Sequence, residues 1–201
     1  MTKEVPLAQR ILDTAEAILR RHGPEKTNVV DIARALGMSH ANIYRHFSSK
    51  KALVDAVAGR WLHTLMDPLE AIASDRTLPA AERLSRWFHH LRKTKRRKLL
   101  QDPELFQLHF NVVKMAPEMI TEHVKMLQDQ VERIVADGVA SGEFAARLDS
   151  GTAARAFLQA TMAFHHPALV LQKPATTEAD ARHVLALVLA GLRAGPASEN
   201  L

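Results

Sequence analysis

The sequence predicts an all-α fold of about nine helices, and three observations support this prediction. Apolar residues recur at intervals of three and four along nearly all of the 201 residues, which is the spacing of one buried helical face. Runs in which β-branched residues alternate with polar ones, the pattern of strands, are missing. Helix start and stop signals follow one another at helical distances, as in Asp102-Pro103-Glu104 and at Gly195-Pro196.

The first four predicted helices are separated by short turn signals. Gly23 and Gly37 follow the first two helices, where a residue that tolerates positive φ ends a helix. Thr27 or Asn28 is expected to cap the second helix, because a side-chain oxygen satisfies the free amides of the first turn. The predicted spans are residues 6–22, 28–36, 39–46 and 49–74.

Five further helices are expected in the second part of the chain. Proline or a capping side chain marks each start. The first of them begins at Pro79 and runs through Trp87 and Leu91 into a basic run, and the second begins at Asp102. The last three are predicted to cover residues 117–142, 149–171 and 176–195. We expect a domain of residues 1–55 and a second domain of residues 56–201.

Composition narrows the classes of protein. The chain has no cysteine, which excludes disulfides and thiolate metal sites. It shows no apolar signal segment at its start and no apolar run of about 18 residues, so we expect a cytoplasmic protein without a membrane partner. Residues 1–60 hold 10 basic and 6 acidic residues, whereas residues 61–201 hold 17 and 16. This basic excess favours a polyanionic partner for the first part of the chain.

The two short helices around Gly37 form a predicted helix-turn-helix. In such a unit the second helix lies in the major groove of double-stranded DNA, with its N-terminal residues at the base edges. The same geometry also occurs inside helical proteins that do not bind DNA. The apolar positions expected to hold the pair together are Val29, Ile32, Ala33, Leu36, Met38 and Ile43.

The side chains around this second helix are suited to DNA. Asn42 can bond adenine through two hydrogen bonds, Ser39 can bond several bases, and the methyl group of Ala41 can contact thymine. Further side chains can donate to phosphate and fix the register. These phosphate donors are Thr27, Tyr44, His46 and Lys50.

The segment from about residue 8 to 55 resembles the DNA-binding signature of the tetracycline-repressor (TetR) family. More than ten positions carry the resemblance through residue type, spacing and helix register. They are Thr27, Asp31-Ile32-Ala33, Leu36-Gly37-Met38-Ser39, Ile43-Tyr44, His46-Phe47, Ser49-Lys50 and Leu53.

The resemblance implies a homodimeric bacterial repressor of transcription that binds a palindromic operator. It also implies that a small ligand in the C-terminal domain changes the spacing of the two DNA-reading heads. His40 stands where a basic or small residue is common, and Asn42 and Arg45 are variable positions, so the operator sequence does not follow. The implied DNA contacts are Thr27, Ser39, His40, Asn42, Tyr44, His46 and Lys50.

A ligand pocket is the first hypothesis for the second domain. The helix from Pro117 has one predicted core row, Ile120, Val124, Leu127, Val131 and Ile134, and a neighbouring row that suits a pocket. Mixed apolar and polar candidates favour a hydrophobic or aromatic ligand, although plain core packing explains each residue equally well. The pocket candidates are Leu65, Trp87, Phe88, Leu91, Phe106, His109, Phe110, Val113, Met119, His123, Met126, Phe157, Thr161, Phe164 and His165.

Two histidine pairs and a basic run have simpler interpretations. Adjacent histidines on a helix point about 100° apart and no HExxH motif occurs, so we expect neither a metal nor a cofactor. The run Arg92–Lys98 is interpreted either as a solvated helix end and loop or as a second phosphate-binding patch.

A dimer interface is expected on the last two predicted helices. Small residues on one and an apolar row on the other would form a four-helix bundle with a second copy, although one chain could also bury these rows internally. The residues are Ala153, Ala156, Ala160, Ala163, Val184, Leu187, Val188, Gly191 and Leu192.

A ligand-released repressor is therefore the leading hypothesis. A constitutive or architectural DNA-binding protein with a solid C-terminal core, and a ligand-dependent activator, are the alternatives. A helical enzyme is not expected, because the chain has no G-x-S-x-G, no P-loop and no glycine-rich dinucleotide motif.

Overall fold

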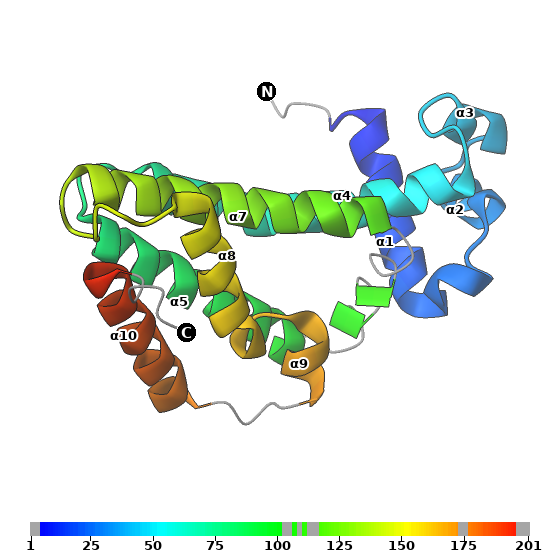
Figure 1. The fold of residues 1–201 in the computed structure, drawn as a ribbon. Helices are drawn as coiled ribbons and strands as arrows, with labels where there is room; N and C mark the ends of the chain where they lie inside the picture. Colours follow the sequence, from blue (N-terminus) through cyan, green and yellow to red (C-terminus); the bar gives the residue numbers. More distant parts are fainter. Residues whose placement is uncertain (1–4, 102–105, 108–109, 112–116, 173–176, 196–201) are drawn as a thin grey trace. The chain divides into compact units, whose positions relative to one another are not determined.

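The computed structural model describes residues 5–101, 106–107, 110–111, 117–172 and 177–195. Within these ranges the chain forms nine α-helices and one short 3-10 helix, without strands, which confirms the all-α prediction (Figure 1). The elements are α1 (Leu7–Lys26), α2 (Val29–Ala35), α3 (His40–Tyr44), α4 (Lys50–Ser74), α5 (Ala80–Gln101), α7 (Pro117–Ala140), α8 (Ser150–Ala160), η1 (Met162–Phe164), α9 (Pro167–Gln172) and α10 (Glu178–Ala194).

The chain divides into two compact units. The N-terminal unit comprises residues 1–63 and 102–120, and the C-terminal unit comprises residues 64–101 and 121–201. The long helices α4 and α7 therefore contribute residues to both units.

One apolar cluster holds the N-terminal unit together. It takes residues from each of the first four helices, and it contains the apolar positions predicted to join α2 to α3. Arg60 of α4 adds ion pairs with Asp13 and Glu16 of α1. Such pairs near the surface contribute little stability, so the apolar cluster dominates. Its buried members are Ile11, Ala15, Leu19, Val29, Ile32, Ala33, Ile43, Leu53, Val57 and Ala58.

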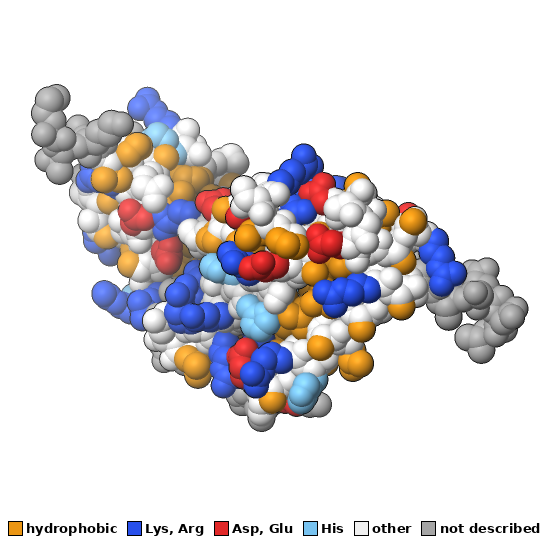
Figure 2. Space-filling model, turned by 90° about the vertical axis from the view of Figure 1, so that its left-hand side faces the viewer, with side chains coloured by type: hydrophobic (Ala, Val, Ile, Leu, Met, Phe, Trp, Pro, Cys, Tyr) orange, Lys and Arg blue, Asp and Glu red, His pale blue; other side chains and the backbone are white. Residues whose placement is uncertain are grey.

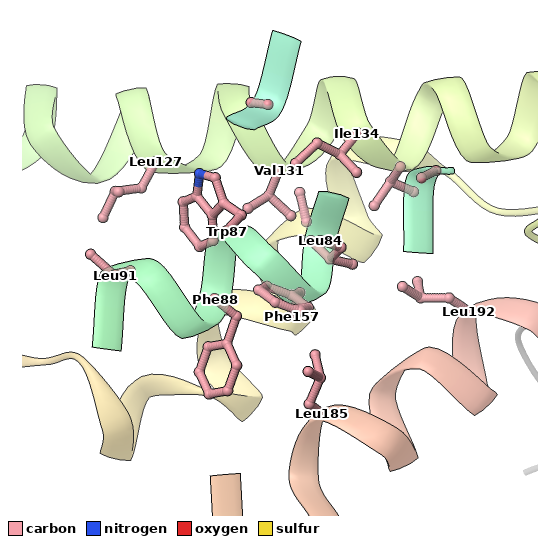
Figure 3. Packing of buried hydrophobic residues seen from close by; sticks show 14 of the residues in the cluster. Leu84, Trp87, Phe88, Leu91, Leu127, Val131, Ile134, Phe157, Leu185 and Leu192 are labelled. Carbon is pink, nitrogen blue, oxygen red and sulfur yellow. The ribbon is translucent and has the colours of Figure 1, made fainter. Parts of the chain in front are cut away.

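A larger cluster forms the core of the C-terminal unit. Figure 3 shows Trp87 of α5 pointing towards Leu127 and Val131 of α7, and Leu185 of α10 pointing towards Phe157 of α8. All five side chains are at most 5% exposed. Residues far apart in the sequence therefore meet in one apolar interior, which is the main source of stability of this unit.

Buried polar side chains at the edge of this core form hydrogen bonds, although the Nε of Arg83 has no partner among the described residues. The indole nitrogen of Trp87 donates to the side-chain oxygen of Gln130 at 2.8 Å, and the amide of Gln130 donates to Glu70 at 3.1 Å. Arg83 is 2% exposed, and it donates to the Ala73 carbonyl and to Asp137, both at 2.9 Å. A buried guanidinium requires such partners, because an unpaired charge in the interior costs several kcal/mol, about 3–5.

The structure corrects the interpretation of the basic run as a solvated helix end and loop. The run Arg92–Lys98 lies inside α5, which continues to Gln101. Arg92 and Lys95 are only 6% and 4% exposed. They follow Phe88 and Leu91 at intervals of four, so the helical period places them on the buried face.

Two further predictions were wrong in detail. The predicted helix of residues 149–171 is broken into α8, η1 and α9, because the Thr161 hydroxyl bonds to the Phe157 carbonyl and Pro167 supplies no amide. Ile120 and Val124 are 37% and 47% exposed and lie outside the core. Leu127, Val131 and Ile134, the other members of the predicted core row, are buried. The polar residues His123 and Gln130 of α7 are buried as well, and a pattern of apolar residues does not detect them.

We predict opposite effects of adding one methyl group at two helical glycines. In Gly138→Ala the new Cβ would lie 2.3 Å from the ring of the buried Phe144 and 2.9 Å from the Cβ of Ala80. We expect a loss of about 1–3 kcal/mol in the free energy of unfolding. In Gly59→Ala nothing lies within 4 Å, so a gain of up to about 1 kcal/mol is expected from helix propensity. Urea unfolding followed by circular dichroism measures both, and equal stability of the two variants would contradict the packing described for α7.

Candidate functional site

The turn between α2 and α3 is fixed by local hydrogen bonds. Asn28, one of the two residues predicted to cap α2, does so by accepting from the amide of Val30 at 3.2 Å. Gly37 adopts φ 66°, a conformation that residues with a Cβ rarely adopt. The next amide, that of Met38, donates back to the Ala33 carbonyl at 3.0 Å. These bonds set the direction in which α3 leaves the turn.

Helix α3 is anchored by one residue and exposes the others. Ile43 is 1% exposed and belongs to the core of the N-terminal unit. Tyr44 is 45% exposed, and its ring lies edge-on to that of His40, with 6.3 Å between the ring centroids. Ser39, His40, Ala41 and His46 are exposed and Asn42 is half-buried. A short helix of exposed hydrogen-bonding side chains on an apolar anchor suits insertion into a major groove.

Two predicted phosphate contacts outside this helix differ in exposure: Thr27 is buried and Lys50 is exposed. Thr27 is 3% exposed, and its hydroxyl donates to the Gly23 carbonyl at 2.7 Å. The hydroxyl proton that a phosphate would need is therefore already used within the protein. Lys50 is exposed at the start of α4, and its ammonium lies 3.4 Å from the Glu25 carbonyl. Ser49 caps α4 by accepting from the amide of Ala52 at 3.0 Å.

The predicted pocket residues do not all belong to one unit. Phe106, Phe110 and Met119 belong to the N-terminal unit, where Phe106 contacts Trp61 with ring centroids 6.1 Å apart. His109 and Val113 lie outside the described residues. The other candidates belong to the C-terminal unit, and all of these except the half-buried Met126 are buried: Leu65, Trp87, Phe88, Leu91, His123, Phe157, Thr161, Phe164 and His165.

The aromatic candidates of the C-terminal unit pack against one another. Phe88 makes edge-to-face contacts with Phe157 and Phe164, with ring centroids 6.2 and 5.7 Å apart. Trp87 contacts Phe157 in the same manner at 6.2 Å. These rings therefore belong to the hydrophobic core of the C-terminal unit, and their role in a pocket stays a prediction.

A group of polar side chains is buried beside these rings. Thr161 and His165 lie together, with 3.3 Å between the hydroxyl oxygen and Nε2 of the imidazole. His123 is 7% exposed, and both of its ring nitrogens are buried without a hydrogen-bond partner among the described residues. Burial, and to a smaller extent the charge of Lys95, lowers the pKa of His123 and that of His165 to about 3.

Lys95 belongs to this group and was missed as a site residue. Burial lowers the pKa of its ammonium group to about 8, so the group is still mostly charged at pH 7. The position could have been found from the sequence, because Lys95 follows Leu91 by four residues and so shares its helical face. Its place in a run of seven basic or polar residues hid that signal.

Metal binding has no support in the described part of the chain. No group of three or more His, Asp or Glu side chains is placed to hold an ion there. In the same residues no helix combines the length and the apolar character needed to cross a bilayer.

An open groove of about 460 Å³ lies between α8 and α10. Hydrophobic side chains are also exposed between charged ones on the face of the molecule shown in Figure 2. Three of the predicted interface residues do not line the groove: Ala163, Val184 and Leu187, the last of which is 73% exposed. Six do line it: Ala153, Ala156, Ala160, Val188, Gly191 and Leu192.

Comparisons with known sequences match both parts of the chain. A family model described as "Bacterial regulatory proteins, tetR family" matches residues 11–57. A second one, described as "Tetracyclin repressor-like, C-terminal domain", matches residues 80–185. An uncharacterized HTH-type transcriptional regulator of Mycobacterium tuberculosis is 38% identical over 77 residues, and this match covers only 38% of each chain.

Solved structures share the fold over nearly the whole chain. FadR from Bacillus halodurans, a fatty acid degradation regulator, has a TM-score of 0.67 at 21% identity and covers 96% of this chain and 99% of its own. SmeT, the repressor of the multidrug efflux pump SmeDEF of Stenotrophomonas maltophilia, has a TM-score of 0.64 at 22% identity over 92% and 90%. FadR from Bacillus subtilis, solved with stearoyl-CoA, has a TM-score of 0.61 at 19% identity over 94% and 99%.

Neighbouring residues of α3 test how this helix is held. Ile43→Ala removes most of a side chain that is 1% exposed, and we expect the free energy of unfolding to fall by about 2–4 kcal/mol. Tyr44→Ala removes a larger side chain that is 45% exposed, and we expect a loss below about 1 kcal/mol. Thermal unfolding by circular dichroism compares the two. The anchoring would be refuted by a Tyr44→Ala variant that is less stable than Ile43→Ala.

Proposed function

The chain belongs to the tetracycline-repressor family of bacterial regulatory proteins, and from this premise we propose that it is a homodimeric repressor that a small hydrophobic ligand releases from a palindromic operator. The exposed helix α3 on its buried Ile43 anchor carries this proposal. Such a protein acts in the cytoplasm, where the DNA is, and it needs no catalytic group.

We propose that residues 1–55 act as the DNA-binding domain, with α3 in the major groove. Ser39, His40 and Asn42 would face the bases, and Tyr44, His46 and Lys50 would contact phosphates. The exposure of most of these side chains supports the assignment. The buried hydroxyl of Thr27 would support the turn instead of donating to DNA.

We propose that residues 56–201 bind the ligand and a second copy of the chain. A palindrome requires two heads related by a two-fold axis, with successive major grooves about 34 Å apart. The ligand would bind better to dimers with a different head spacing and would thereby reduce operator affinity. Ligand complexes are known for structural neighbours, one with triclosan and one with stearoyl-CoA, which supports a ligand-responsive protein.

Fluorescence anisotropy with the palindromic DNA upstream of the protein's own gene tests the DNA-reading role. Asn42→Ala should weaken binding about 5- to 150-fold, because a bidentate contact to adenine contributes about 1–3 kcal/mol of discrimination. Wild-type affinity should also fall steeply between two salt concentrations, since phosphate contacts release counterions. Scrambled DNA of equal length is the control. Binding that depends on salt but not on Asn42 would contradict base reading by α3.

The groove between α8 and α10 gives a test of the dimer. Ala156→Glu places a charge in this groove, and we expect it to convert dimers to monomers at micromolar concentration in sedimentation velocity. Ala136→Glu adds the same charge at an exposed position of α7 outside the groove, and it should remain dimeric. An Ala156→Glu variant that stays dimeric would place the interface elsewhere.

A further inference from the structure

Three buried polar side chains of the C-terminal unit belong to different elements. Lys95 comes from α5, His123 from α7, and His165 is the residue that follows η1. They are 4%, 7% and 8% exposed. Leu91 of α5 and Leu127 of α7 lie side by side in the core in Figure 3, and Lys95 follows Leu91 by one turn while His123 precedes Leu127 by one turn. The charge of Lys95 also lowers the pKa of both histidines.

The cluster is only partly satisfied by the protein. His165 bonds to the Thr161 hydroxyl, and the backbone of Leu158 also hydrogen-bonds to it. His123 has no partner at either ring nitrogen among the described residues. For Lys95, burial lowers the pKa, and within the described ranges no carboxylate is found to raise it again. A polar group that is buried without a partner destabilises the fold, so its retention indicates a partner from outside the chain.

The charges decide which partner fits. At neutral pH Lys95 is mostly protonated, because its pKa is about 8, and both imidazoles are neutral, because theirs are about 3. The cluster therefore offers one positive charge and N–H donors, and the described residues supply no negative charge to balance them. A metal ion would be repelled by the ammonium group. A carboxylate would accept from the ammonium and from the N–H of a neutral imidazole, and such charge-assisted bonds are strong.

The surroundings of the cluster are apolar. Leu91 precedes Lys95 by one helical turn on α5, and Leu127 follows His123 by one turn on α7. Phe164 lies directly before His165. All three apolar side chains are at most 5% exposed and belong to the hydrophobic core. A ligand whose acid group reached the cluster would need a hydrophobic body.

We propose that Lys95 and His123 bind the carboxylate of the effector, and that this effector is a monocarboxylic acid with a hydrophobic chain or ring. This inference rests on the proposed function, because it names the chemical class of the releasing ligand. His165, held by Thr161, positions the polar wall of the site. The site would recognise the negative charge of the acid, so the neutral amide of the same molecule should bind more weakly.

Isothermal titration calorimetry on the full-length protein tests the head-group site directly. The probes are decanoate and 3-phenylpropionate, each compared with its primary amide. We expect at least one acid to bind the wild type, and its amide to bind at least tenfold more weakly. Lys95→Met should weaken binding of the acid at least tenfold and leave binding of the amide unchanged. Lys93→Met, an exposed position two residues away on α5, is the matched control and should bind the acid like the wild type.

Three results would overturn the inference. The first is that neither acid binds the wild type, and the second is that acid and amide bind equally. The third concerns thermal unfolding without ligand. The inference expects Lys95→Met to have a higher melting temperature than the wild type, because an unbalanced buried charge is removed. A lower melting temperature would contradict it. A Lys95→Met variant that melts below the wild type would show that an acidic group of the protein pairs with Lys95.

The anisotropy assay separates this inference from the proposed function. If the acid releases wild type and Lys93→Met from the operator, and Lys95→Met requires at least tenfold more acid, both proposals hold. If the wild type binds the operator but no acid releases it, the repressor stands and the acid as effector is wrong. If the wild type binds no operator while calorimetry detects the acid, the repressor is wrong and the anion site stands.

Discussion

The buried face of α5 is the constraint on which the C-terminal unit depends. Leu84, Trp87, Phe88 and Leu91 follow one another at helical spacing and pack against α7, α8 and α10. The same period carries Lys95 into the interior one turn later. The helix cannot bury its aromatic residues without also burying this ammonium group, because its direction is fixed by the larger apolar contacts. The hydrophobic effect thus stabilises the unit enough to hold a charge where water does not solvate it.

In the N-terminal unit, by contrast, a helix that is too short to be stable alone is largely exposed and has to be held by its neighbours. α3 has five residues, and isolated helices of that length do not form in water. Its geometry comes from Ile43 in the core and from the turn at Gly37, so the exposed side chains are free to vary without loss of the fold. If α3 reads DNA as proposed, the same scaffold can present different residues to different DNA sequences.

The sequence predicted what depends on local rules and failed where burial is decided by tertiary contacts. The approximate bounds of α4 and α10 followed from spacing, and Asn28 was one of the two residues predicted to cap α2. The family followed from the resemblance of the helix-turn-helix residues to a known signature. Pro167 was an available signal for the break after α8, and it was overlooked. Neither Ile120, which is exposed, nor His123, which is buried, could be assigned from an apolar pattern, because that pattern contains no information about which helix packs against which face.

The unsatisfied groups in the C-terminal unit give ligand binding a thermodynamic role. Among the described residues, a folded protein that keeps the His123 ring nitrogens without partners and the Lys95 ammonium group buried is less stable than one with an apolar interior at the same positions. An anion that binds there removes that penalty only in the conformation that brings the two groups together. The anion would therefore bind more tightly to one arrangement of α5 and α7 than to others, and its binding would favour that arrangement. A ligand with equal affinity for every arrangement would not change the conformational equilibrium. A well-packed apolar site would bind hydrophobic molecules too, but it would lack this dependence on the mutual position of two helices.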